Sequence, residues 1–328
     1  MNPLLAWALE RRDQLSFSVT EIRGLERFGL FDYCAELTWL GHRCKGRGTD
    51  HQAELALAKA ISESLEAAMI RHYGLANSNG VAAHPELQEA KRLSCFELLE
   101  RDLWLCHYLT KAPFYKLGFE NPLHNDCAKN GVVLGLYASR SNERGRAFMA
   151  LARGDRAAQP FGVIVGLGFA KPTEELFAAE KAWAECARSL LHVLGSPWHE
   201  LGALSLKQLS MQPKYTPELQ GRWALSLEAL AGLFPWIDCE VDSEERPLSS
   251  HADSETYRVL LNPEDRASFG TETGEAPPLY VVQCLNPKLQ SLHFGKSTAA
   301  LVSLDRLTEF SGRRVLWEEV NPLPHPLA

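Results

Sequence analysis

The side chains with the clearest potential for chemistry lie on one predicted helix between residues 85 and 107. Ser94, Glu97, Glu100 and Arg101 stand at positions i, i+3, i+6 and i+7, so they project from roughly one helical face. The other side is apolar and predicts packing against a core, with Leu93, Phe96, Leu99, Leu103 and Trp104. A packed helix that presents two carboxylates and an arginine on one face requires a chemical explanation.

A similar arrangement occurs three times along the chain. Small residues precede each helix: Gly46 to Gly48, Asn79 to Gly80, and Gly166 to Gly168. The two outer helices also carry charged residues at helical spacing: Lys59, Glu63 and Glu66 on the first, and Lys181 and Glu185 on the third. The first glycine and the first key glutamate are 17, 17 and 19 residues apart (46 to 63, 80 to 97, 166 to 185). We therefore predict a recurring unit, a turn of small residues followed by a helix, with spacing too irregular for a solenoid.

Glutamates from three helices would converge if these units pack against one another. Carboxylates held close together cannot all remain ionised unless cations neutralise them. Magnesium usually takes a few carboxylates together with substrate phosphates, and basic side chains bind phosphate oxygens. The spacing therefore suggests a Mg-nucleotide site, with basic groups from Arg47, Arg101 and Lys181.

Two simpler interpretations stay open. Helical Glu/Lys pairs are commonly solvated ion pairs worth about 0.3–0.5 kcal/mol. Glycines ahead of a helix commonly form tight connections, whereas the functional alternative is a phosphate bound by the bare N–H groups of a helix N-terminus. No GxxxxGK[ST] loop is present in the sequence.

Composition excludes several other classes of function. A net charge of −7 over 328 residues argues against general binding to nucleic acid or to an anionic membrane. No apolar run approaches the ~20 residues of a membrane helix, and residues 1–13 do not read as a signal peptide. The eight cysteines include no CxxC and predict reduced thiols in a cytoplasmic protein. Cys95 is either a nucleophile beside Arg101 or, more commonly for a buried thiol, packing.

The periodicity predicts an α+β fold in which the turn–helix units pack on β-sheet. We expect helices at about 50–72 and 173–194, and a helix-like stretch at 222–233. Strands are expected at 30–44, 131–137, 161–166 and 279–285, with a strand or short helix at 144–153. Residues 1–29 form an N-terminal segment, 30–328 a single domain, and 195–277 a variable insertion whose polar part, 242–276, is mobile or faces a partner. The tail after residue 317 is extended because prolines alternate in it.

At these motifs the sequence resembles the YcaO family of ATP-dependent peptide-backbone-modifying enzymes. The central helix matches the family motif SxxExxER completely, from Ser94 to Arg101. The first helix is similar to SxxxExxER, with Lys59 in place of the serine and Ala67 in place of the arginine. Lys181 and Glu185 resemble RxxxE, and Arg47 takes the place of lysine in a Gly-Lys-Gly segment. The end of the chain resembles the PxPxP of azoline-forming members, with Pro322, Pro324 and Pro326.

The resemblance implies a role for each matching residue. Magnesium ligands would be Glu63, Glu66, Glu97 and Glu100. ATP would be bound by Arg47, Lys59, Asn79, Ser94, Arg101, Lys181 and Glu185. The catalytic tail would be formed by Pro322, Pro324 and Pro326, placing the chain end near the reacting amide.

The implied reaction is cyclodehydration of Cys, Ser or Thr in a ribosomally made precursor peptide to thiazoline or oxazoline. Backbone thioamidation or amidine formation, a catalytically degenerate scaffold subunit, and an accessory role in ribosomal-protein methylthiolation remain alternatives. The implied partners are the precursor peptide, a separate leader-peptide-binding protein (ubiquitin-activating-like or TfuA-type) and a second copy of the chain in a homodimer.

Overall fold

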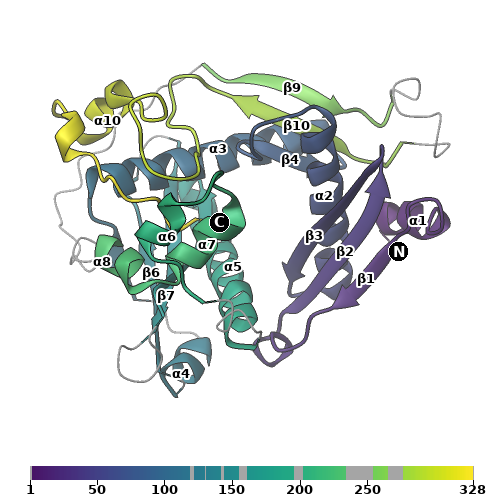
Figure 1. The fold of residues 1–328 in the computed structure, drawn as a ribbon. Coiled ribbons are helices and arrows are strands. Elements are labelled where there is room, and N and C mark those ends of the chain that lie inside the picture. The colour runs from purple at the N-terminus through teal and green to yellow at the C-terminus, as the bar shows by residue number, and fades with distance from the viewer. Residues whose placement is uncertain are drawn as a thin grey trace. The chain divides into compact units, whose positions relative to one another are not determined.

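A computed structural model of the chain describes residues 2–118, 122–129, 131–141, 144–154, 161–195, 202–233, 254–264 and 276–327. The internal contacts divide the chain into unit 1, residues 1–98 and 255–286, and unit 2, residues 99–254 and 287–328. Helices and antiparallel sheets make up both (Figure 1), which confirms the expected α+β class. Across these described ranges, no helix is both long and apolar enough to cross a bilayer.

Unit 1 begins with a three-stranded antiparallel sheet in the order β1-β2-β3. Its strands are β1 (Ser18–Glu21), β2 (Phe31–Trp39) and β3 (His42–Asp50). Helix α2 (Ala53–His72) packs on β2 and β3, and α1 (Pro3–Glu10) packs on α2. The apolar faces of these elements share one buried core, so the first 29 residues contribute side chains to it.

The expected single strand at 30–44 is corrected to two strands joined by a tight hairpin. Trp39 pairs with His42, and the two residues between them, Leu40 and Gly41, have positive φ angles of 51° and 74°. Two-residue hairpin loops favour positive φ because it matches the twist of the strands. The alternating pattern therefore continues past the turn into β3.

The glycines expected in a turn ahead of α2 lie within β3 instead. Gly46 and Gly48 face the backbone of α2, and a Cβ on Gly46 would approach Glu63 Cβ to 2.7 Å. The helix residues opposite these glycines are Ala56 and Ala60, whose carbonyl oxygens are too close for any Cβ on the strand. The glycines are thus required by close helix–strand approach and do not form a phosphate-binding helix N-terminus.

The second sheet of unit 1 is antiparallel in the order β4-β10-β9. It contains β4 (Val81–His84), β9 (Thr256–Leu261) and β10 (Tyr280–Leu285). Gly80, at φ 69°, turns the chain into β4 ahead of α3 (Leu87–Thr110), so here the predicted turn is present. β9 lies within the stretch expected to be mobile or to face a partner, and that expectation is corrected for these residues because β9 pairs with β10. Residues 242–253 and 265–275 lie outside the described ranges.

Unit 2 contains a four-stranded antiparallel sheet in the order β5-β6-β7-β8. The strands are β5 (Tyr115–Leu117), β6 (Val132–Ala138), β7 (Arg146–Gly154) and β8 (Val163–Ala170). The stretch expected as strand or short helix is therefore the strand β7. Helix α5 (Glu175–Gly195) packs on β7 and β8, after the short 3-10 helix η2 (Pro172–Glu174).

The α5–β8 interface repeats the glycine packing of unit 1. Gly166 and Gly168 lie within β8, and a Cβ on Gly166 would stand 2.5 Å from Cys186 N and 3.0 Å from Glu185 Cβ. Ala178 and Ala182 face these glycines from α5. The recurring unit is therefore a glycine-bearing strand that carries a small-residue helix, and the expected turn is corrected here as well.

Short helices complete unit 2. The helix-like stretch at 222–233 divides into two helices, and the structure adds others: α4 (Pro122–Lys129), α6 (Leu206–Ser210), α7 (Pro217–Ala224), α8 (Leu227–Leu233), α10 (Leu304–Ser311) and η4 (Trp317–Glu319). Local capping explains where two of them begin. Thr216 caps α7 ahead of Pro217, and Ser303 caps α10.

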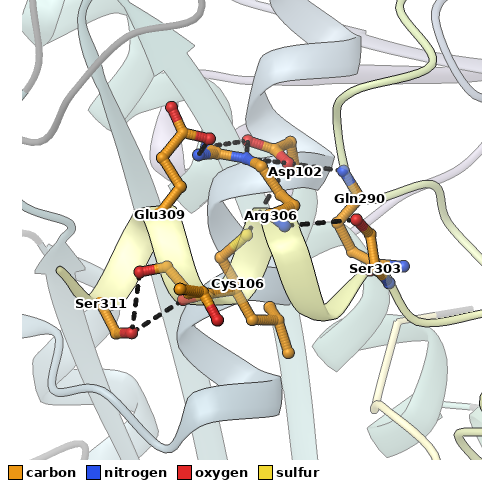
Figure 2. Close-up of polar contacts among 9 residues, drawn as sticks. Asp102, Cys106, Gln290, Ser303, Arg306, Glu309 and Ser311 are labelled. Carbon is orange, nitrogen blue, oxygen red and sulfur yellow. Dashed lines mark hydrogen bonds and ion pairs between the residues drawn. The ribbon is translucent and has the colours of Figure 1, made fainter. Parts of the chain in front are cut away.

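A buried ion pair joins α3 to α10 within unit 2 (Figure 2). The Asp102 carboxylate, with a fully buried side chain, accepts hydrogen bonds from Arg306 Nε at 3.0 Å and Arg306 Nη2 at 2.5 Å. It also accepts from Gln290 N at 2.7 Å, and Cys106 Sγ lies 3.7 Å away. This network fixes the part of α3 that follows Arg101.

Candidate functional site

Three of the predicted metal ligands lie near one another in unit 1. Glu63 Oε2 accepts a hydrogen bond from Arg47 N at 2.9 Å, and Glu66 Oε1 accepts one from Ala83 N at 2.8 Å. Burial, followed by the negative charges of Glu97 and Glu63, raises the pKa of Glu66 well above its ordinary range. Helices α2 and α3 thus hold three carboxylates close enough to disfavour each other's ionised forms.

This carboxylate cluster fits a hard divalent cation by the chemistry of its donors. The cluster offers only oxygen ligands, and its negative charges are mutually destabilising, so a cation would relieve the repulsion. Across the described ranges, however, no three His, Cys, Asp or Glu side chains are arranged as a ready coordination sphere. Binding of magnesium would therefore require the carboxylates to reorient around the ion.

The two basic residues of unit 1 that are predicted to bind ATP, Arg47 and Lys59, are already paired with carboxylates. Arg47 Nε lies 3.1 Å from both oxygens of Asp32, whose side chain is fully buried. Lys59 Nζ lies 2.6 Å from Asp50 Oδ2. Contact of Arg47 and Lys59 with a nucleotide remains a prediction, because each would have to leave its present partner.

Ser94 and Asn79 differ in how their polar atoms are occupied. Ser94 is fully buried, and its hydroxyl donates to Lys91 O of the same helix at 2.9 Å. Asn79 is 7% exposed, and its buried Oδ1 has no hydrogen-bond partner among the described residues. An orphaned buried acceptor is unfavourable. Of the two, Asn79 is therefore the stronger candidate for a ligand contact, and both assignments remain predictions.

The predicted residues of unit 2 form a row of alternating charges. Lys181 Nζ lies 2.8 Å from Glu100 Oε2 and 3.7 Å from Glu185 Oε1, and Arg101 Nε lies 3.9 Å from Glu100 Oε1. Glu185 Oε2 accepts a hydrogen bond from Leu167 N on β8 at 3.3 Å. Glu63 accepts the corresponding bond from Arg47 N on β3.

Ion pairing in this row shifts the pKa values in opposite directions. Burial opposes both shifts, but Glu100 and Glu185 raise the pKa of Lys181, and Lys181 with Arg188 and Arg101 lowers that of Glu185. Glu100, which is 1% exposed, is thus already paired with the ammonium group of Lys181. Its role as a metal ligand remains a prediction.

The predicted tail lies in unit 2 without helix or strand. Pro322 is exposed, whereas Pro324 and Pro326 are buried. The hydroxyl of Tyr108, on α3, donates to Pro324 O at 2.7 Å. The sequence did not indicate Tyr108 or the buried Gln220 as partners of the tail, or that His325 within the tail is buried.

Solved structures with a similar fold include a heterocyclase and a YcaO protein. A heterocyclase in complex with substrate and cofactor superposes with a TM-score of 0.65 at 12% identity, covering 99% of this chain and 57% of that one. The chain has the YcaO fold. YcaO from Methanopyrus kandleri, bound with AMPPCP and Mg2+, gives 0.56 at 15% identity and 92% and 96% coverage. The E. coli microcin synthetase complex gives 0.50 at 11% identity and 83% and 88% coverage.

The YcaO fold is shared here at very low sequence identity. No protein-family model and no curated protein matches the chain by sequence. The chain spans just over half the length of the heterocyclase and nearly the whole of the M. kandleri YcaO. The resemblance in the SxxExxER helix and the three-dimensional similarity thus agree on the fold.

Proposed function

We propose that this YcaO-fold chain is an ATP-dependent enzyme that modifies the backbone of a ribosomally made precursor peptide. The leading reaction is cyclodehydration of Cys, Ser or Thr to thiazoline or oxazoline. The observation that carries the proposal is the cluster of Glu63, Glu66 and Glu97, whose mutual repulsion a magnesium ion would relieve. A YcaO neighbour bound with AMPPCP and Mg2+ supports this cofactor pair.

In this proposal the residues of the chain position the reactants. Bound Mg-ATP supplies the phosphoryl group that turns an amide oxygen into a leaving group. Glu63, Glu66 and Glu97 of unit 1 would hold the magnesium. The family resemblance adds Glu100 as a ligand and assigns Arg101 and Lys181 to phosphate oxygens, for which both would exchange their present carboxylate partner. Preorganised charges of this kind carry most of the catalysis in phosphoryl transfer.

The substrate and partners belong to the same proposal. A heterocyclase neighbour has been solved in complex with substrate and cofactor, which supports a substrate site here, and the family resemblance supports a peptide as that substrate. We infer a separate leader-peptide-binding partner, a homodimer and a cytoplasmic location from the family resemblance. The product remains open between an azoline, a thioamide and an amidine.

A second function is favoured by a specific observation. Arg47 and Lys59 are paired with Asp32 and Asp50, and Ala67 packs against the apolar core where the motif has an arginine. These features support a YcaO-fold subunit that has lost nucleotide binding and scaffolds a modification complex.

Calorimetric titration with ATP and Mg2+ separates the two functions. The enzyme should bind micromolar Mg-ATP, and Glu97→Gln should weaken binding by about tenfold or more because a charged ligand is lost. Glu86→Gln is the matched control, since Glu86 is exposed on the approach to the same helix. If the folded wild-type chain binds no nucleotide, the enzymatic function is refuted and the scaffold function is favoured. With a candidate peptide, mass spectrometry distinguishes loss of one water from exchange of oxygen for sulfur.

A further inference from the structure

The segment Asn321–Leu327 is held in unit 2 by hydrogen bonds from outside itself. Proline lacks an N–H and cannot complete a helix or a sheet ladder, so the carbonyl groups of this segment need donors from other elements. Asn321 N donates to Leu109 O at 2.8 Å, and Tyr108 Oη donates to Pro324 O at 2.7 Å. His325 is 1% exposed although it lies between two prolines. The segment therefore packs within unit 2 with the imidazole ring of His325 buried.

Gln220, fully buried on α7, uses its whole amide at this contact. Its Nε2 donates to Leu327 O at 3.0 Å and lies 2.8 Å from Nδ1 and 3.3 Å from Nε2 of His325. Its Oε1 accepts from Gly295 N at 2.7 Å. His325 Nε2 faces His293 O, and because a carbonyl oxygen only accepts, Nε2 must carry the imidazole proton. Nδ1 is then the unprotonated nitrogen, and it is the ring nitrogen nearer to the Gln220 amide.

The imidazole of His325 packs on the same stripe of α3 that carries Arg101. Its ring meets Trp104 edge-on, with centroids 5.9 Å apart, and Tyr108 at 6.5 Å. Arg101, Trp104 and Tyr108 stand at i, i+3 and i+7, so they share one helical face. Burial, His293 and the charge of Arg101 lower the pKa of His325 to about 3, so the ring is neutral at physiological pH.

We propose that Gln220 is a positioning residue that fixes His325, and with it the segment Asn321–Leu327, against the Arg101 face of α3. The requirement of this docking for turnover rests on the proposed function, whereas the docking itself does not. Gln220 touches no reacting atom in this proposal. It acts through His325 and the backbone of the segment.

Hydrogen exchange of the peptide covering the segment tests the docking without any substrate. Gln220→Leu keeps a similar size but removes the hydrogen bonds of the amide, and Tyr108→Phe removes the hydroxyl that donates to Pro324 O and interacts with Asn321. Tyr108→Phe should accelerate exchange in this peptide about fivefold and Gln220→Leu about tenfold or more, because a lost hydrogen bond worth about 1 kcal/mol corresponds to about a fivefold change. Gln212→Leu is the matched control, because its side chain only donates to Gln208 O on the surface. Unchanged exchange in both variants would overturn the docking.

The tautomer and the protonation state of the His325 imidazole provide a readout that general destabilisation of the fold would not change. In wild type, NMR should find His325 neutral with the proton on Nε2 from about pH 5 to 8. Gln220→Glu preserves the shape but presents an acceptor to Nδ1, so the pKa of His325 should rise toward neutrality. A ring in the other tautomer, or one unaffected by Gln220→Glu, would overturn the assigned contact.

Turnover then tests the role in the reaction. Gln220→Leu should lower kcat at unchanged ATP affinity, because the nucleotide contacts remain. Faster hydrogen exchange in the segment together with unchanged turnover would refute the positioning role. If wild type turns over no peptide while exchange and tautomer behave as expected, the proposed function fails and the docking stands.

Discussion

Replacing Asp102 with asparagine tests the buried ion pair that joins α3 to α10. The substitution keeps the size of the side chain and leaves one oxygen to accept from Gln290 N. It removes the negative charge opposite Arg306, whose side chain is only 5% exposed. The guanidinium would keep its pair with Glu309, 3.3 Å from Nη1, but would lose its fully buried carboxylate, and the new amide N–H groups would face its donors.

The expected cost in unfolding free energy is about 3–5 kcal/mol, as for other buried pairs that lose one member. Glu319→Gln is the matched control. It breaks the exposed pair with Arg313, in which the side chains are 59% and 40% exposed, and should cost about 0–1 kcal/mol. Urea unfolding followed by circular dichroism measures both.

A double variant tests whether the loss of stability comes from the charge that has lost its buried partner. Asp102→Leu together with Arg306→Met removes both ions, so much of the loss in Asp102→Asn should be recovered. A cost of Asp102→Asn below about 1 kcal/mol would refute the reasoning, since an exposed pair would cost as little.

Two further variants address packing and the carboxylate cluster. Gly166→Ala should destabilise the chain by about 1–3 kcal/mol or more in urea unfolding because its Cβ meets the Ala182 backbone, whereas Gly118→Ala, with open space around it, should be neutral. The folded state raises the pKa of Glu66, so its stabilising contribution is present below the ordinary value of 4.5 and is lost as the pH rises. Metal-free protein should therefore lose thermal stability above about pH 4.5, less so in Glu66→Gln, and Mg2+ should restore it at neutral pH. No difference between wild type and Glu66→Gln in chelator would contradict the raised pKa.

The helices were predictable because their apolar positions repeat with the helical period. The polar face of α3 followed from spacing, and the approach of Glu63, Glu66 and Glu97 followed from the recurring spacing on the assumption that the units pack against one another. The glycine strands were missed because small residues indicate a turn locally, and only the opposing helix shows that they serve close approach. A signal was present in the alanines at i and i+4, Ala56 and Ala60, on the facing helix.

The pairing of charges was not predictable in the same way. Arg47 meets Asp32 only because the hairpin register places their positions diagonally across β2 and β3. The partners Asp102 and Arg306 are separated by 204 residues, so no local pattern connects them. Sequence spacing therefore identified which residues share an element, and long-range topology decided which charges were already engaged.

The glycine-bearing strands also constrain how such a sequence can diverge. At Gly46, Gly48, Gly166 and Gly168 the obstacle is helix backbone, so every side chain is excluded equally, whatever its chemistry. Polar positions such as Arg47 can change as their partners change, because exchange of one ion pair for another preserves the backbone. Among distant relatives of this chain, we expect the glycines of these strands to persist after the charged residues between and opposite them have been replaced.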